Sequence, residues 1–199
     1  MMPEPQEKTE TREQILEAAR ERFRQFGYGK TTMAEIAGDC RMSAANLYRF
    51  FENKHDIGAA LACSCLADDE ARLKETLKRP GLNAAQRLEA FILETLHYTY
   101  EQWQEQPRIG ELVQAVISMR ADLVQQHQQA KTRLLAELLR AGNESGEFDV
   151  PDPEHIAGTI LVAIIALDVP FFLGMYSKDQ LETIGHDVAA LILKGLLKR

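Results

Sequence analysis

Cysteine is scarce in this sequence, and the short motifs that carry most enzyme chemistry are absent. Three cysteines among 199 residues cannot all pair with one another, so we interpret them as reduced thiols of a cytoplasmic protein. The sequence has no G-x-S-x-G, no phosphate-binding glycine loop and no H-E-x-x-H, and its five histidines do not have metal-ligand spacing. We therefore expect neither an enzyme nor a protein that holds a metal or cofactor.

Positive charge is also in short supply. The chain has 23 Lys and Arg against 30 Asp and Glu, a net charge of −7. This balance argues against non-specific coating of nucleic acid, which normally requires a basic protein. The deficit is uneven, because residues 1–58 hold nine basic and ten acidic residues, whereas residues 59–199 hold fourteen and twenty. A specific, groove-reading domain in the N-terminal part remains compatible with these charges.

Signal-peptide and membrane-spanning patterns are missing as well. The longest apolar stretch, residues 156–176, contains Asp168 and Pro170 and is soon followed by Lys178. These residues favour a buried helix over a membrane span. The start of the chain has no basic region followed by an apolar one. We expect no membrane partner.

The most informative stretch is residues 31–54, TTMAEIAGDCRMSAANLYRFFENK. Thr32 and Glu35 have the spacing of a capping box, in which each residue's side chain accepts from the other's backbone amide, and predict the start of a helix. Ser43 offers a second N-cap, and Leu47 begins the apolar side of the helix that follows. The stretch therefore predicts two short helices separated by a turn.

The second of these helices presents residues that suit the major groove of DNA. Ala44 and Ala45 let the backbone approach closely and can touch thymine methyl groups, Asn46 can pair with adenine, and Arg49 can contact guanine or a phosphate. The alternative is a surface helix of an ordinary helical domain, because short helix-turn-helix patterns are common by chance.

The spacing TT-x-x-x-IA followed by S-x-x-x-LY-x-FF-x-NK resembles the DNA-binding domain of the tetracycline-repressor (TetR) family of bacterial transcription regulators. The resemblance covers residues 9–69, and LYRFFENKHDI is its most specific part. It implies a three-helix domain with its helix-turn-helix at about residues 32–51 and a recognition helix at residues 43–50. The Tyr48 and Lys54 positions usually hold phosphates in that family. The candidate DNA contacts are Thr32, Met33, Arg41, Ser43, Ala44, Ala45, Asn46, Tyr48, Arg49 and Lys54.

One residue departs from the family pattern. The turn of the motif usually has glycine, which adopts a positive φ easily, and here the position is Arg41. We expect either a strained turn or an additional phosphate contact from the guanidinium group.

Helical periodicity continues through the rest of the chain, and no segment resembles a strand. We expect an all-α fold of about nine helices. The resemblance implies that residues 70–199 form a second domain for effector binding and dimerisation. The longer expected helices lie at about residues 54–78, 122–141, 153–173 and 178–198.

The last two expected helices combine large aliphatic residues with glycine and alanine, which permit close packing of helices. A four-helix bundle made of two such pairs, one from each subunit, accounts for this composition, and members of the TetR family dimerise in this way. The predicted interface residues of this homodimer are Ile160, Ile164, Leu167, Ile184, Val188, Ala189, Leu191 and Ile192.

The resemblance also implies an effector cavity in residues 70–199. The side chains available to line it are apolar or aromatic with few polar groups, and core packing is the alternative for each: Leu96, Tyr100, Trp103, Met119, His127, Phe171, Phe172 and Met175. A shortage of buried charge suggests a neutral effector, either hydrophobic, aromatic or an acyl chain.

The sequence thus predicts a sequence-specific transcriptional regulator that binds a palindromic operator in double-stranded DNA. We expect a repressor that is released by a small, largely apolar effector. The alternative is a helical homodimeric interaction protein, or a carrier of a hydrophobic ligand, that has lost DNA binding.

Overall fold

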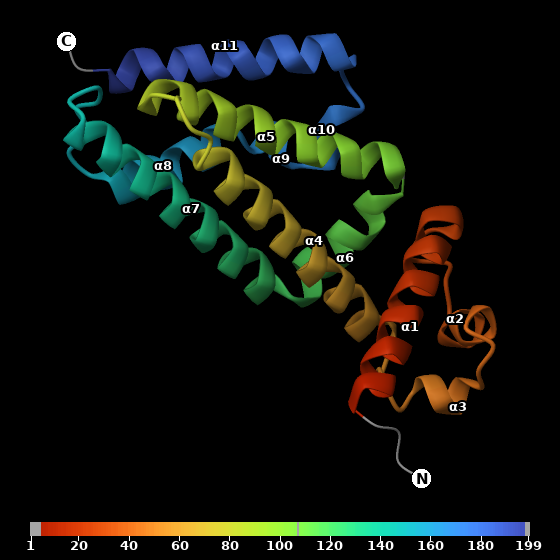
Figure 1. Cartoon of the computed structure of the whole chain (residues 1–199). Coiled ribbons are helices and arrows are strands. Elements are labelled where there is room, and N and C mark those ends of the chain that lie inside the picture. The colour runs from red at the N-terminus through yellow and green to blue at the C-terminus, as the bar shows by residue number, and fades with distance from the viewer. Residues whose placement is uncertain (1–4, 107, 198–199) are drawn as a thin grey trace. The chain divides into compact units, whose positions relative to one another are not determined.

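The computed structural model describes residues 5–106 and 108–197, and these residues form eleven helices and no strand (Figure 1). The expected all-α fold is confirmed. A single isolated bridge, between Phe148 and Leu197, is the only extended pairing among the described residues. Contacts divide the described residues into two compact units, one containing residues 5–65, 105–106 and 108–122, and the other residues 66–104 and 123–197.

The first unit is built around the N-terminal helices. Its elements are α1 (Pro5–Phe26), α2 (Met33–Asp39), α3 (Ala44–Leu47), the beginning of α4 (Lys54–Leu77) and α6 (Ile109–Met119). Ile15, Ala19 and Phe23 recur at helical spacing on the buried side of α1, and Ile36 and Leu47 are buried on α2 and α3. The unit includes α6, which lies well beyond the sequence-based boundary near residue 69.

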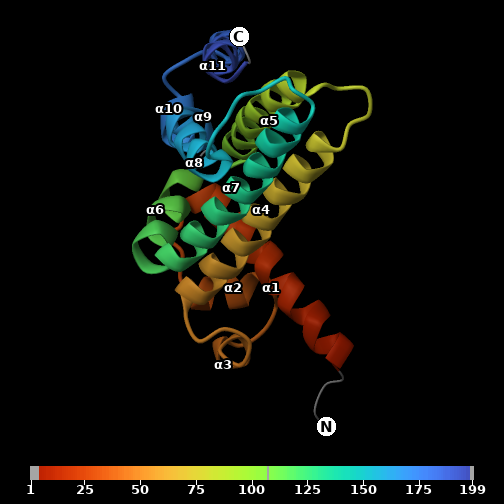
Figure 2. The same cartoon turned by 90° about the vertical axis from the view of Figure 1, so that its left-hand side faces the viewer.

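The second unit contains the rest of α4 and the remaining helices. These are α5 (Ala84–Glu105), most of α7 (Ala121–Glu144), α8 (Pro153–Ala163), α9 (Ile165–Asp168), α10 (Pro170–Leu173) and α11 (Lys178–Leu196). In both views, α7 runs beside the C-terminal part of α4 (Figures 1 and 2). Two side-chain hydrogen bonds of 2.8 Å, Glu89–His186 and His97–Glu182, join α5 to α11.

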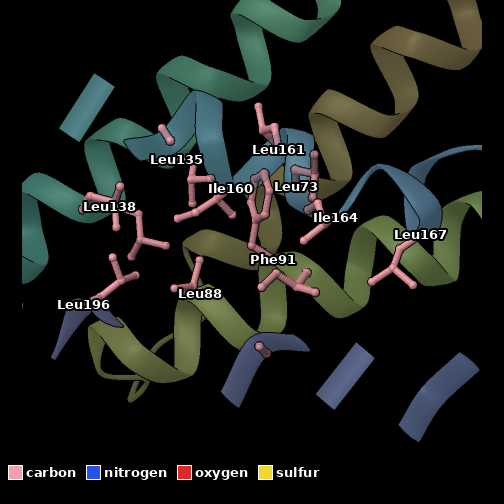
Figure 3. Close-up of a cluster of buried hydrophobic side chains, with 14 of the residues drawn as sticks. Leu73, Leu88, Phe91, Leu135, Leu138, Ile160, Leu161, Ile164, Leu167 and Leu196 are labelled. Carbon is pink, nitrogen blue, oxygen red and sulfur yellow. The ribbon is translucent and has the colours of Figure 1, made fainter. Parts of the chain in front are cut away.

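The core of the second unit is continuous and apolar. Figure 3 shows the Phe91 ring projecting from α5 toward Leu73 of α4 and Ile160 of α8. Leu135 and Leu167 belong to the same cluster, so α7 and α9 share this core. Because the unit buries large aliphatic side chains from every one of its helices, it has the apolar contact needed to hold them together.

The prediction of one helix at residues 153–173 is wrong. Its start is confirmed, because Asp152 caps α8 by accepting from the His155 amide at 3.0 Å. The helix then breaks at Ile164 and again at Val169, whose extended backbone (φ −125°, ψ 121°) is typical of a residue before proline. Pro170 has no amide hydrogen to continue a helix, so α10 starts anew there. The breaks place Asp168 at the end of a four-residue helix.

Helix α7 also differs from expectation, since it continues through Gly142 to Glu144. A β-carbon at Gly142 would collide with the Phe148 ring, so this glycine serves close packing and does not end the helix. No helix in the described part of the chain combines the length and the hydropathy needed to cross a membrane.

Candidate nucleic-acid interface

Helix α2 begins with the capping box that the sequence predicts. The Glu35 amide donates to Thr32 Oγ1 at 3.3 Å, and the Thr32 amide donates to Glu35 Oε2 at 2.8 Å. The hydrogen bonds from Thr32 also lower the pKa of the Glu35 carboxyl group. Thr32 is exposed at the beginning of α2, and its hydroxyl group is already engaged with Glu35.

The turn between α2 and α3 is a Schellman motif with arginine at the left-handed position. The Met42 amide donates to the Ala37 carbonyl at 2.9 Å, and the Arg41 amide donates to the Gly38 carbonyl at 3.0 Å. Arg41 has φ +55°, the only positive value at a non-glycine position among the described residues. The expected positive φ is therefore confirmed, and the Cβ of Arg41 strains this turn.

Helix α3 is shorter than the predicted span of residues 43–50. Ser43 caps it as expected, because Ser43 Oγ accepts from the Asn46 amide at 3.2 Å. Beyond Leu47 the chain continues with tighter i to i+3 bonds, from the Arg49 amide to the Asn46 carbonyl and from the Phe50 amide to the Leu47 carbonyl. Leu47 is fully buried and holds this segment in the core of the first unit.

Most candidate DNA contacts on α3 and its flanks face outward. Tyr48 is 51% exposed, and Ser43, Ala45, Arg49 and Arg41 are exposed as well. Two further candidates, Ala44 and Asn46, are half-buried. The segment from Arg41 to Arg49 therefore offers a partner a methyl group, an amide, a phenol and two guanidinium groups.

Helix α1 supports α2 through Arg22. Its guanidinium group forms two hydrogen bonds with the Asp39 carboxylate, at 2.6 and 3.0 Å, and lies 3.2 Å from Glu35. The paired guanidinium lowers the pKa of Asp39. These contacts fix the angle at which α2 crosses α1, and they occupy Arg22 with protein partners.

Two of the predicted DNA contacts have side chains that are buried or already bonded within the protein. Met33 is only 8% exposed and belongs to the core of the first unit, so its side chain is not available to DNA.

Lys54 Nζ donates to three backbone carbonyls, those of Tyr28 at 2.7 Å, Thr31 at 2.8 Å and Gly29 at 3.3 Å. These bonds use all three hydrogens of the ammonium group, so Lys54 organises the α1–α2 loop and is not a free phosphate contact. Burial lowers the pKa of Lys54, and the nearby Glu111 and Glu35 carboxylates oppose this shift.

The beginning of α6 holds the same loop from another direction. Glu111 Oε2 accepts from the Gly29 amide at 3.0 Å, and Arg108 donates to the Phe26 carbonyl at 3.0 Å. Gly27 has φ +87°, and a β-carbon there would lie 2.6 Å from Glu111 Oε1. The contacts of Glu111 and Arg108 with this loop were not predicted from the sequence, because each residue lies 82 positions from its partner and no local pattern indicates the pairing.

Comparison with known protein families identifies this arrangement. Residues 15–61 match the model described as bacterial regulatory proteins of the tetR family, and residues 84–189 match the tetracyclin repressor-like C-terminal domain. The second match alone covers more than half of the chain. The chain belongs to the TetR family. It is therefore a DNA-binding transcriptional regulator, and the helix-turn-helix of the first unit is its DNA-binding element.

Known relatives extend the likeness over nearly the whole chain. The uncharacterized HTH-type transcriptional regulator YhgD of Bacillus subtilis (strain 168) is 28% identical over 189 residues, which are 92% of this chain and 94% of YhgD. A putative TetR-family regulator from Mesorhizobium loti has a TM-score of 0.74 at 16% identity, covering 96% of this chain and 98% of that one. SmeT, the repressor of the Stenotrophomonas maltophilia multidrug efflux pump SmeDEF, has a TM-score of 0.69 at 18% identity, covering 94% and 90%.

The residues predicted to line an effector cavity differ in burial. Leu96 is buried in the core of the second unit, and Tyr100 and Trp103 pack against that core with rings 5.8 Å apart. Phe171, Phe172 and Met175 are instead exposed, Phe171 by 78%. Met119 belongs to the first unit and is also exposed. Two hollows of 320 and 630 Å³ lie among α4, α5 and α7, and neither is lined by any of the eight residues.

The second unit does contain buried charge, so the predicted shortage is wrong. His127, one of the predicted cavity residues, is buried between the carboxylates of Asp69 and Glu70. Lys131 has no exposed surface and contacts Asp69 and Asp168. Sequence patterns gave no sign of this cluster, because Lys131 and His127 lie one turn apart on α7 and their partners come from α4 and α9.

The predicted interface residues of a TetR-type dimer divide into two groups. Ile160, Ile164, Leu167 and Ala189 are buried in the core of their own chain, so they are not available to a partner in this conformation. Ile184, Val188 and Ile192 are half-buried, and Leu191 is 70% exposed. The periodicity of α8 and α11 identified an apolar face correctly but could not tell which subunit covers it.

Proposed function

We propose that this chain is a dimeric repressor that binds a palindromic operator through the segment from Arg41 to Arg49. A small, largely apolar effector, bound by the second unit, releases the operator. The observation that most directly supports contact with DNA bases is the exposed surface of α3 and its flanking residues, which carries small and polar side chains. Hydrogen bonds in the Arg41 turn and at the Ser43 cap fix the backbone of this segment. The domain division of this proposal is residues 9–69 for DNA binding and 70–199 for effector binding and dimerisation, with α6 packed in the first unit.

The candidate DNA contacts divide into base readers and phosphate contacts. Asn46 and Arg49 have the donor and acceptor patterns that pair with adenine and guanine, and the methyl groups of Ala44 and Ala45 suit thymine. Tyr48 and Arg41 are exposed at the edges of this face, where they suit phosphates. Thr32 and Ser43, the exposed N-cap residues of α2 and α3, contact the sugar-phosphate backbone of the DNA. Lys54 positions the loop before α2 and does not touch DNA.

Dimerisation is supported by the apolar side chains that the second unit leaves exposed. Val162 on α8, Ile165 on α9, Phe171 on α10 and Leu191 on α11 are all large, apolar and exposed. Exposed apolar side chains in such numbers commonly mark a protein interface. A second copy of this chain suits them, because an operator with two half-sites requires two recognition helices about one DNA turn apart. Light scattering that gives the mass of a single chain would contradict this dimer.

Release by an effector is supported by the position of α6 in the sequence. It is covalently linked to α5 on one side and α7 on the other, and within the first unit it holds the α1–α2 loop through Arg108 and Glu111. A ligand that shifts α5 or α7 therefore acts on the end of α6 to which that helix is joined. To release DNA tenfold, it must bind the released form about 1.4 kcal/mol more tightly. SmeT, which has the same fold, is known in a complex with triclosan, a small molecule.

Selection of bound sequences from a random pool of double-stranded DNA tests the proposed function. We expect enrichment of a palindrome whose half-sites are about 10 base pairs apart, centre to centre. A variant with both Asn46→Ala and Arg49→Ala serves as the control, because Arg49 is exposed, Asn46 is only half-buried, and neither belongs to the buried core. It should select no common sequence. Failure of the unmodified protein to enrich any sequence would contradict operator binding.

A further inference from the structure

The buried charges of the second unit form one connected network. Lys131 Nζ on α7 lies 2.7 Å from Asp168 Oδ1 on α9 and 3.4 Å from Asp69 Oδ2 on α4. Lys131 has no exposed surface, and Asp69 is 4% exposed. Taking these charges out of water is costly, so a network of this kind is stable only if its members satisfy one another.

His127 is part of the network and is held in its charged form. Its Nε2 lies 3.2 Å from Asp69 Oδ2, and its Nδ1 lies 3.0 Å from Glu70 Oε1. Carboxylate oxygens only accept, so both ring nitrogens must donate. Burial lowers the pKa of His127, but the hydrogen bonds to Asp69 and Glu70 outweigh burial, and the net shift is upward. The two carboxylates therefore favour the imidazolium form of the ring.

One oxygen of the network is left without a donor. Asp69 Oδ2 accepts from both His127 and Lys131, whereas Asp69 Oδ1 is buried and has no hydrogen-bond partner among the described residues. An unpaired buried acceptor costs about 1–3 kcal/mol, and more if it is charged. With Asp69, Glu70 and Asp168 against Lys131 and His127, three negative and two positive charges leave the network at −1.

We propose that Asp69 Oδ1 anchors a small organic cation that carries N–H donors, namely a primary ammonium group on an apolar body. The net charge favours a cation over a neutral donor or an anion, and a charge-assisted hydrogen bond to Oδ1 supplies the missing partner. Leu73 and Leu135, each one turn further along its helix from Asp69 and Lys131, are packed in the core beside the network, so the surroundings of Asp69 on that side are apolar. The network reaches solvent at Glu70, whose side chain is 25% exposed, and this edge is the entry side.

The location of Asp69 connects the site to the regulator's DNA-binding unit. Asp69 lies on α4, and the first residue of the same helix is Lys54, which holds the α1–α2 loop of the first unit. A ligand bound at Asp69 therefore acts on a continuous helix whose first residue holds this loop through its side chain. The binding site is inferred from the network alone, whereas its role as the effector site rests on the proposed function.

Calorimetric titration of the whole protein with hexylammonium tests the site without any mutation. Hexanol has the same body with a neutral donor, hexanoate has the same body with the opposite charge, and N,N,N-trimethylhexylammonium keeps the charge without N–H donors. We expect hexylammonium to bind at least tenfold more tightly than each of the other three. Equal affinities, or no binding of hexylammonium, would overturn the proposal and leave a water molecule as the partner of Oδ1.

Two isosteric variants locate the binding. Asp69→Asn should weaken hexylammonium binding at least tenfold, because it removes the charge and keeps the shape. Glu94→Gln is the matched control, since Glu94 is another buried carboxylate of the second unit, paired with Arg72 and Arg79 outside the network. The Glu94→Gln variant should bind hexylammonium with the same affinity as the unmodified protein. Equal losses in both variants would overturn the assignment to Asp69. If Asp69→Asn does not fold, the four-ligand comparison still decides the question.

Operator binding in the presence of hexylammonium separates the site from the regulatory role. Ligand binding together with tenfold release of DNA supports both the site and the effector role. Ligand binding without release supports the site and contradicts the effector role. A protein that binds no DNA but still distinguishes hexylammonium from its three analogues would overturn the proposed function alone.

Discussion

Two lysines, one in each unit, show opposite ways of using a charge inside this protein. Lys54 in the first unit donates to three carbonyls of one loop, and every hydrogen of its ammonium group has a partner. Lys131 in the second unit is more deeply buried and balances carboxylates from two other helices, one of which keeps an unpaired oxygen. The first arrangement is complete and therefore structural. The second is incomplete, which is the property expected of a ligand site.

The largest effect should follow from removing the charge of Lys131. Lys131→Met leaves the Asp69 and Asp168 carboxylates buried with less compensation, which should lower the free energy of unfolding by roughly 3–5 kcal/mol. Urea denaturation followed by circular dichroism measures this loss. The double variant with Asp168→Leu removes one uncompensated charge as well and should recover part of it. A single variant as stable as the unmodified protein would mean that the network contributes nothing to the fold.

Replacing Lys54 should have a smaller effect of a different kind. Lys54→Met removes three hydrogen bonds from a loop near the surface, so we expect a loss of about 1–3 kcal/mol in stability. Operator binding should weaken because the loop before α2 is less ordered. The dependence of affinity on salt should stay the same, since Lys54 holds no phosphate. A salt slope lower by about one would show instead that Lys54 neutralises a phosphate.

The strain at Arg41 predicts a gain in stability. Arg41→Gly relieves the left-handed backbone and should raise the free energy of unfolding by about 0.5–1 kcal/mol. Arg41→Ala is the matched control, because it removes the same charge and keeps the β-carbon. The alanine variant should show no gain. Both variants should lower the salt slope of operator binding if the guanidinium group contacts a phosphate.

Sequence reasoning succeeded where the physical cause is local. The capping box at Thr32, the cap at Ser43 and the positive φ at Arg41 all depend on residues within a few positions of one another. It failed where partners come from distant segments. Nothing near Lys54 or Glu111 in the sequence shows that both hold the α1–α2 loop.

Burial was the other limit of sequence reasoning. The family resemblance assigned Met33 to the DNA contacts, and the apolar pattern of its helix assigned Ile160 to the dimer interface, but neither says which surface covers a side chain. The structure places Met33 in the core of the first unit and Ile160 in the core of the second. The charged network was invisible for the same reason, since Asp69, Lys131 and Asp168 come together only through the packing of α4, α7 and α9.

The smallest expected effect is a pH dependence of stability in the second unit. Because the pKa of His127 is raised above 6.5 in the folded protein, its contribution is present below that pH and is lost as pH rises through the folded value. Stability measured by urea denaturation should therefore fall as pH increases above neutrality. His127→Gln should remove this slope, whereas His155→Gln at an exposed position should retain it. The same slope in both variants would assign it to other groups.

The central claim is that the outward face of α3 and of the turn that follows it reads bases. It is tested most directly by Arg49→Ala on the selected operator and on a set of its single-base variants. Affinities measured at fixed salt should show relaxed specificity at one position in each half-site, with a loss of about 1–3 kcal/mol for each base contact removed. Arg49→Ala that weakens binding by the same factor for every sequence would contradict base reading by this residue.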